Sequence, residues 1–187
     1  MTKTSFLIVI GAVLVAAVAG AQSLPPVKGD FGLGASVSTS SQTLQAFYDV
    51  TDSLVLVPKV GAYHYNYADT VGGATTNYPG TWYQGGIGIF YVVHAFSNLS
   101  LQVGPSFTYS SESYQANLNP DNLQFTYWSV SLDLRPVAMI NKNLGVFTNF
   151  GVQYYSQDTK DKTSSADTLI TQFQLISPSL GVVYYFK

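Results

Sequence analysis

Apolar side chains alternate with polar or small ones along most of this chain, and this two-residue period limits what the chain can fold into. The clearest stretch is residues 99–110, where apolar side chains occupy every second position: Leu99, Leu101, Val103, Pro105, Phe107 and Tyr109. Successive side chains of a β-strand point to opposite faces, so a period of two predicts strands. A helical period of 3.6 residues is largely missing, and the chain is predicted to be all-β.

A second stretch, residues 124–136, indicates which face meets which medium. Its apolar positions from Trp128 to Leu134 alternate with Ser129, Ser131, Asp133 and Arg135. Only 10% of the residues are charged, against about 25% in ordinary soluble domains. An Arg or Lys side chain facing lipid at mid-membrane costs about 2 to 4 kcal/mol. The apolar face is therefore predicted to face lipid, with Asp133 and Arg135 pointing into a barrel.

Other stretches sort in the same way, with glycine and serine prominent on the inner face. The predicted lumenal positions are Gly32, Gly34, Ser36 and Ser38 in residues 30–39, and Trp82, Gln84, Gly86, Gly88 and Phe90 in residues 81–93. Small side chains there leave room for larger ones in a crowded barrel interior.

Residues 54–67 are ambiguous by hydrophobicity, because both faces carry apolar side chains. Lys59 and Gly61 decide the orientation, since both match the inner-face composition. The predicted lumenal set is Lys59, Gly61, Tyr63 and Tyr65, and the lipid-facing set is Leu56, Pro58 and Val60. A β-bulge could exchange the two faces partway along, and bulges are also expected at the in-strand prolines Pro58, Pro105, Pro136 and Pro178.

Three further stretches, residues 44–50, 144–156 and 169–186, of which 44–50 has the weakest pattern, bring the strand count to about eight, an even number as bacterial single-chain barrels require. Short turns are predicted near residues 51–53, 94–98 and 141–143, and longer polar loops near residues 68–80, 111–122 and 157–168. Barrels of this kind place short turns in the periplasm and long loops outside. The N- and C-termini of the barrel are therefore both expected at the periplasmic side. The first outer connection, near residues 39–43, is expected to be short.

The N-terminus is predicted to be an export signal. Lys3 precedes an apolar run from Phe6 to Val18, and the small residues Ala19-Gly20-Ala21 follow. This arrangement is typical of a cleavable signal peptide, and the run is shorter than the roughly 20 residues of a spanning helix. The expected organisation is a signal peptide over 1–21, a periplasmic lead-in over 22–28 and a barrel over 29–187.

The last strand carries a spaced pattern of four residues: Ser179, Gly181, Tyr184 and Phe186. This pattern resembles the C-terminal assembly signal of outer-membrane barrels, although Lys187 follows where the family usually ends on the aromatic residue. Together with the export signal and the alternation, it makes the chain similar to the small outer-membrane β-barrels of the OmpA/OmpX or opacity-protein type. The resemblance implies an antiparallel up-and-down transmembrane β-barrel in the bacterial outer membrane. Membrane lipid and the barrel assembly machinery would be its partners.

Candidate chemistry is sparse. Lys59, Asp133 and Arg135 form a predicted lumenal charge network, which either gates a narrow channel or belongs to a packed, non-conducting polar core. A lipid-modifying enzyme would need a histidine near the outer rim with a serine and a carboxylate in reach, but the same-face neighbours of His64 are Ala62 and Asn66. No catalytic, cofactor or metal site is predicted.

The leading functional hypothesis is a non-enzymatic surface protein that displays its polar loops for adhesion, for other surface contacts or for envelope integrity. The alternative is a narrow pore for small solutes or ions, followed by a lipid A-modifying enzyme and a soluble periplasmic lipid-binding barrel. A net charge of −2 offers no basic surface for nucleic acid.

Overall fold

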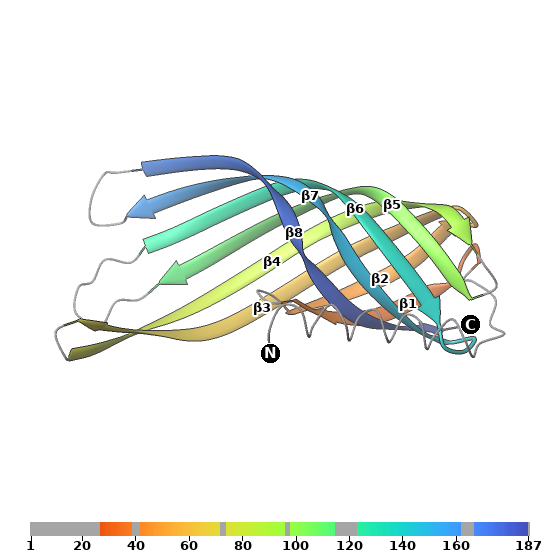
Figure 1. Ribbon diagram of the computed structural model, residues 1–187, viewed down its shortest axis with the longest axis horizontal. Helices are drawn as coiled ribbons and strands as arrows, with labels where there is room; N and C mark the ends of the chain where they lie inside the picture. The colour runs from red at the N-terminus through yellow and green to blue at the C-terminus, as the bar shows by residue number, and fades with distance from the viewer. Residues whose placement is uncertain are drawn as a thin grey trace.

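The computed structural model describes residues 27–38, 42–71, 74–95, 98–114, 123–161 and 167–186. The strands are β1 (Phe31–Val37), β2 (Gln42–Thr51), β3 (Leu54–Val71), β4 (Ala74–Ala95), β5 (Leu99–Tyr114), β6 (Leu123–Met139), β7 (Leu144–Asp161) and β8 (Asp167–Phe186). Each pairs antiparallel with its neighbour in chain order, and β1 pairs with β8 to close a barrel (Figure 1). The prediction of an eight-stranded up-and-down barrel is confirmed. The predicted signal peptide lies outside the described residues.

The predicted sorting of side chains between the two faces of the wall is also confirmed. In β6, Leu132 is 56% exposed on the outer face, whereas its neighbour Asp133 and the next lumenal residue, Arg135, are each 2% exposed. Val55, Val57 and Lys59 share the inner face of β3 in one register, so no bulge exchanges its faces there. An apolar outer face is the opposite of what a soluble lipid-binding barrel requires. Among the described residues, no helix is long and apolar enough to cross a membrane.

Two rings of aromatic side chains bound the apolar outer face. The ring nearer the short turns, the inner girdle, consists of Phe31, Tyr48, Tyr91, Tyr184 and Phe186; the outer girdle consists of Tyr83, Tyr109, Trp128, Tyr154 and Phe173. On β4, Tyr83 and Tyr91 are eight residues apart, about 26 Å along a strand and about 20 Å along the axis at a tilt near 40°. Aromatic girdles around an apolar band about 25 Å tall are typical of barrels that span a membrane.

Glycines on the inner face make room for aromatic rings, as the sequence predicts. A Cβ atom at Gly181 would overlap the Phe147 ring, and one at Gly88 would overlap the Phe90 ring. A Cβ atom at Gly34 would lie 3.0 Å from Phe47. Small residues therefore determine where the large lumenal side chains lie.

Gly181→Val is expected to lower the free energy of unfolding by about 1 to 3 kcal/mol, because overpacking forces neighbouring groups to shift. Gly85→Val is the matched control, since a Cβ atom there meets nothing within 4 Å. Urea titration of the protein refolded into lipid vesicles measures both. Equal stability of the two variants would contradict this account of the lumenal glycines.

The in-strand prolines are accommodated mainly by local interruptions of pairing, which corrects the prediction of bulges. At Pro58, Pro105 and Pro136, two residue pairs are lost on one side without a register change, while pairing on the other side continues. A strand residue directs its N–H toward one neighbouring strand only, so proline disturbs one ladder. Only at Pro178 does a register shift occur, because Asn149 pairs with Ser179 but Gly151 pairs with Ile176.

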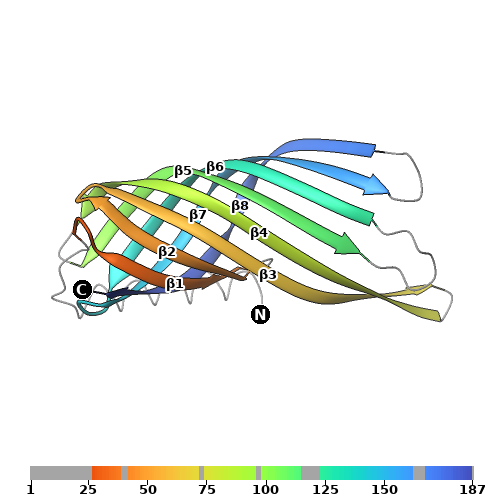
Figure 2. The same cartoon turned by 180° about the vertical axis from the view of Figure 1, so that it is seen from behind.

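The wall of the barrel is uneven at its outer end. The prediction of a loop over residues 68–80 is wrong, because β3 and β4 stay paired up to Val71 and Ala74. The pairing of β7 with β8 likewise reaches Lys160 and Asp167, and β5 extends to Tyr114; residues 115–122 lie outside the described chain. In contrast, β1 and β2 end about midway along the barrel (Figures 1 and 2).

Candidate functional site

The half of the lumen nearer the short turns is filled mainly by apolar side chains, although Asp49 and Ser100 are also buried there. Four rings, Phe47, Phe90, Phe147 and Tyr185, lie at its centre, and we refer to them as the aromatic floor. Around them pack Val55, Val57, Val137, Met139 and Val183, and all nine side chains are 0–1% exposed. The rings of Phe47 and Phe147 have centroids 5.2 Å apart in an edge-to-face arrangement. The expectation of a polar lumen is therefore wrong for most of this half of the barrel.

Arg135 lies against the aromatic floor. Its Cζ atom lies 4.0 Å from the centre of the Phe90 ring, 5.4 Å from that of Phe47 and 5.5 Å from that of Phe147. Such cation–π contacts stabilise a guanidinium charge by about 0.5 to 2 kcal/mol. Its Nε and Nη1 atoms are buried and have no hydrogen-bond partner, so the rings stabilise the charge without satisfying these donors.

Asp133 occupies the next lumenal position of β6. Its Oδ2 atom accepts a hydrogen bond from Ser106 Oγ at 2.9 Å, and Ser106 Oγ in turn lies 2.7 Å from Ser131 Oγ. The carboxylate interacts electrostatically with both Lys59 and Arg135. The structure therefore brings the three predicted lumenal charges together from β3 and β6, with two cations to one carboxylate.

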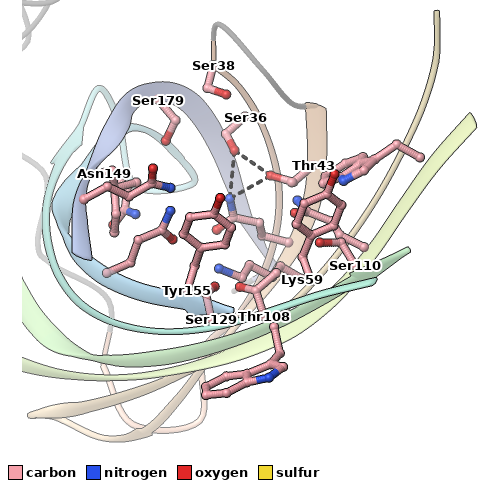
Figure 3. A pocket seen from close by; sticks show the side chains of 18 of the residues that line it. Ser36, Ser38, Thr43, Lys59, Thr108, Ser110, Ser129, Asn149, Tyr155 and Ser179 are labelled. Atoms are coloured by element: carbon pink, nitrogen blue, oxygen red, sulfur yellow. Dashed lines mark hydrogen bonds between the residues drawn. The ribbon is translucent and has the colours of Figure 1, made fainter. Parts of the chain in front are cut away.

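A polar cavity of about 450 Å³ lies next to this cluster, in the outer half of the lumen. Figure 3 shows hydroxyl and amide side chains converging on it, including Ser36, Thr43, Ser129 and Asn149, together with Lys59. Some of these groups bond to one another: Ser36 Oγ lies 2.7 Å from Thr43 Oγ1, and Gln45 Nε2 donates to Ser36 Oγ at 2.8 Å. The polar inner face was predicted from the sequence, whereas the cavity was not, since its volume depends on how eight strands close.

The remaining lumenal predictions fall near the outer rim. Tyr63 shares a face with Lys59, but it lies above the end of β2 and is exposed; the side chain of Tyr65 lies outside the described set. His64 is exposed, and its Nδ1 atom lies 3.0 Å from Thr81 Oγ1. Within the described ranges, no three His, Cys, Asp or Glu side chains gather as a metal site.

The four C-terminal pattern residues divide between the two faces of β8. The backbone oxygen of Ser179 accepts a hydrogen bond from Thr148 Oγ1 at 2.7 Å, and Gly181 lies beside the Phe147 ring. Tyr184 and Phe186 face outward, with ring centroids 5.2 Å apart, and Phe186 also stacks on Phe31. The two aromatic residues of the pattern are thus part of the inner girdle.

No protein-family model and no curated protein matches the sequence. Among solved structures, the chain is similar to a major outer membrane protein from Thermus thermophilus, with 14% identity, a TM-score of 0.51, and coverage of 84% of this chain and 99% of that one. It also matches Acinetobacter baumannii CarO2, with 10% identity, a TM-score of 0.45, and coverage of 87% of this chain and 100% of that one. A third match is the attachment invasion locus protein Ail of Yersinia pestis, with 9% identity, a TM-score of 0.43, and coverage of 84% of this chain and 94% of that one. The fold is that of a small outer-membrane β-barrel.

Proposed function

We propose that this protein is a non-enzymatic, non-conducting outer-membrane barrel that displays extended β-hairpins at the cell surface, for adhesion or for envelope integrity. The observation that carries the proposal is the contrast between the two ends of the barrel. One end is filled by the aromatic floor, while strands β3 to β8 continue past the outer girdle. On β4, Ala74 lies nine residues beyond Tyr83, about 30 Å along the strand.

The floor argues against the alternative of a narrow pore. Its side chains and those packed around it come from six of the eight strands, β2, β3, β4, β6, β7 and β8, and are 0–1% exposed. An eight-stranded barrel is just wide enough for side chains to fill. The charge cluster of Lys59, Asp133 and Arg135 is therefore proposed to belong to an interior that is closed at the end nearer the short turns, and not to a gate.

The experiment combines a conductance measurement with shortening of the hairpins. Purified protein in planar bilayers is expected to show no conductance steps. Replacing residues 66–79 by an Asn-Gly turn keeps the pairing of Tyr65 with Gly80, and the β5–β6 and β7–β8 hairpins are shortened in the same manner. Surface binding or envelope resistance is expected to fall while the barrel still folds. Survival of every such phenotype after all three hairpins are shortened, or regular conductance steps, would contradict the proposal.

The C-terminal pattern of Ser179, Gly181, Tyr184 and Phe186 is proposed to serve barrel assembly. Phe186→Ala is expected to reduce the amount of folded protein in outer-membrane fractions several-fold, measured as the band that shifts on boiling before electrophoresis. Phe150→Ala is the control, because Phe150 is also an outward-facing phenylalanine but lies in β7. Equal yields of the two variants would argue against an assembly role.

A further inference from the structure

The barrel wall has a gap above the β1–β2 hairpin. The outermost pair of this hairpin is Val37 with Gln42. β8 pairs with β1 only from Leu180 to Phe186, and β3 pairs with β2 only up to Val60. Farther out, in the described part of the chain, residues 167–179 of β8 pair only with β7, and residues 61–71 of β3 pair only with β4. We call this break in strand pairing the notch; Figures 1 and 2 show β1 and β2 ending well short of the outer ends of β3 to β8.

The notch lies at the level of the hydrocarbon layer. Along β8, Leu180 at its base is seven residues from Phe173 of the outer girdle, about 23 Å along the strand. At a strand tilt near 40° this is about 18 Å along the axis, so the base of the notch lies between the two girdles. Phe173 and Leu175 on the β8 edge are 81% and 79% exposed. On the side of β1 and β2, the paired wall therefore ends at the level where the outer leaflet of a membrane would contact it.

A second hollow, of about 460 Å³, lies over β1, β2 and β3 beside the notch. Its lining includes Val37, Leu44 and Val60 from the lipid-facing side of the wall. It also includes Ser36 and Thr43, which line the polar cavity as well. The hollow and the polar cavity therefore adjoin at the β1–β2 hairpin, and an apolar chain can lie in the hollow with its end beside the cavity.

The polar cavity carries an excess of positive charge. Lys59 and Arg135 are its charged lining residues, and Asp133 is the carboxylate beside them. Two other acidic side chains are described in the upper wall. Glu112 lies three lumenal positions beyond Ser106 on β5 and accepts a hydrogen bond from Tyr127 at 2.8 Å. Asp158 lies on β7 opposite Thr126 and does not line the cavity. Arg135 is 2% exposed with two donors unpartnered. Buried charged donors left unsatisfied are costly, so an anion that accepts from them is favoured.

We propose that the cavity binds the anionic head group of a single-chain amphiphile, with the head group at Arg135 and Lys59 and the hydrocarbon chain leaving through the notch. A carboxylate or a phosphate head group satisfies the same donors. A cavity of about 450 Å³ lies within the usual range of ligand sites. The chain would lie against Val37, Leu44 and Val60, in the outer leaflet. This site is separate from the surface hairpins and goes beyond the display function.

Binding is tested with full-length mature protein in zwitterionic phosphatidylcholine nanodiscs, titrated with carboxyl-¹³C laurate and followed by NMR against protein-free discs. Saturable binding of laurate is expected, and dodecyl phosphate compared with laurate identifies the preferred head group. Dodecanol, which lacks the charge, and acetate or inorganic phosphate, which lack the chain, are expected to compete at least tenfold more weakly. Absence of saturable binding by both amphiphiles overturns the proposal. If dodecanol competes as strongly as the anionic amphiphiles, the proposed contact of the head group with Arg135 and Lys59 is overturned. If acetate or inorganic phosphate competes as strongly, the proposed route of the chain through the notch is overturned.

Two variants test the residues. Arg135→Met and Lys59→Met are each expected to weaken laurate binding at least tenfold, and Lys142→Met, in the exposed β6–β7 turn, is expected to leave it unchanged. Methionine keeps apolar contact with the floor rings at position 135. If Arg135→Met fails to give the heat-shifted band, Lys59→Met carries the test, since Lys59 is only partly buried. Wild-type affinity in the folded variants would overturn the proposal.

Discussion

Ile87→Arg is expected to lower the free energy of unfolding by about 2 to 4 kcal/mol, the cost of a basic side chain facing lipid at the bilayer midplane. Ile87 faces outward on β4, halfway between Tyr83 of the outer girdle and Tyr91 of the inner girdle. A guanidinium there must lose its water or bend the chain toward an interface. Urea titration of the protein refolded into phosphatidylcholine vesicles measures the change.

The control for Ile87→Arg is the same substitution at the level of the outer girdle. Ser111 lies on the outward face of β5 and pairs with Tyr83, and the cost of a basic residue near the interface is only about 0 to 1 kcal/mol. Ser111→Arg is therefore expected to be nearly neutral. Equal costs at the two depths would show that the belt between the girdles does not lie in hydrocarbon.

The second large effect is expected at the aromatic floor. Phe90→Ala is expected to cost about 3 to 5 kcal/mol, as truncations of buried phenylalanines do. Phe90 is fully buried, and its ring makes the shortest cation–π contact of Arg135. Truncation leaves a cavity that other side chains fill only in part, and it removes the ring beneath a buried charge. The same urea titration measures this loss.

Phe173→Ala is the matched control for Phe90→Ala. Its ring is 81% exposed and contacts Tyr154 with centroids 5.1 Å apart. Only the aromatic pair is lost there, which is worth about 0.5 to 1.5 kcal/mol. A cost at position 173 as large as that at position 90 would mean that the floor is not the main packed core of the barrel.

The fold was predictable because lipid and lumen impose opposite demands on neighbouring residues. Asp133 beside Leu132 allows only one orientation of β6, and Lys59 settles β3 in the same way. The N-terminal ends of β4 and β8 and the last four residues of β3, 68–71, were not predicted, because a strand beyond the membrane meets water on both faces. Its sequence then loses the two-residue period, and residues 68–80 carry the Asn, Thr and Tyr residues of a polar loop.

The sequence predicts which side chains of the candidate site face the lumen, but not at which level along the barrel axis each one lies. The sequence places Phe90, Asp133 and Arg135 on inner faces, yet it does not show that Phe90 and Phe147 lie level with Arg135. That level depends on the register between β4, β6 and β7, which the hydrophobic pattern determines only to within two residues. The low wall at β1 and β2 could not be predicted either, because it depends on where pairing stops in β3 and β8.

Oxygen accessibility of spin labels along β6 tests the transmembrane barrel most directly. The chain contains no cysteine, so single cysteines at Ser129, Val130, Ser131 and Leu132 each carry one label. In lipid vesicles, labels at Val130 and Leu132 are predicted to collide with oxygen, which concentrates in hydrocarbon, more often than labels at Ser129 and Ser131. Uniform oxygen accessibility along the four positions, or an alternation with the serine positions more accessible, would contradict a barrel whose apolar face meets the membrane.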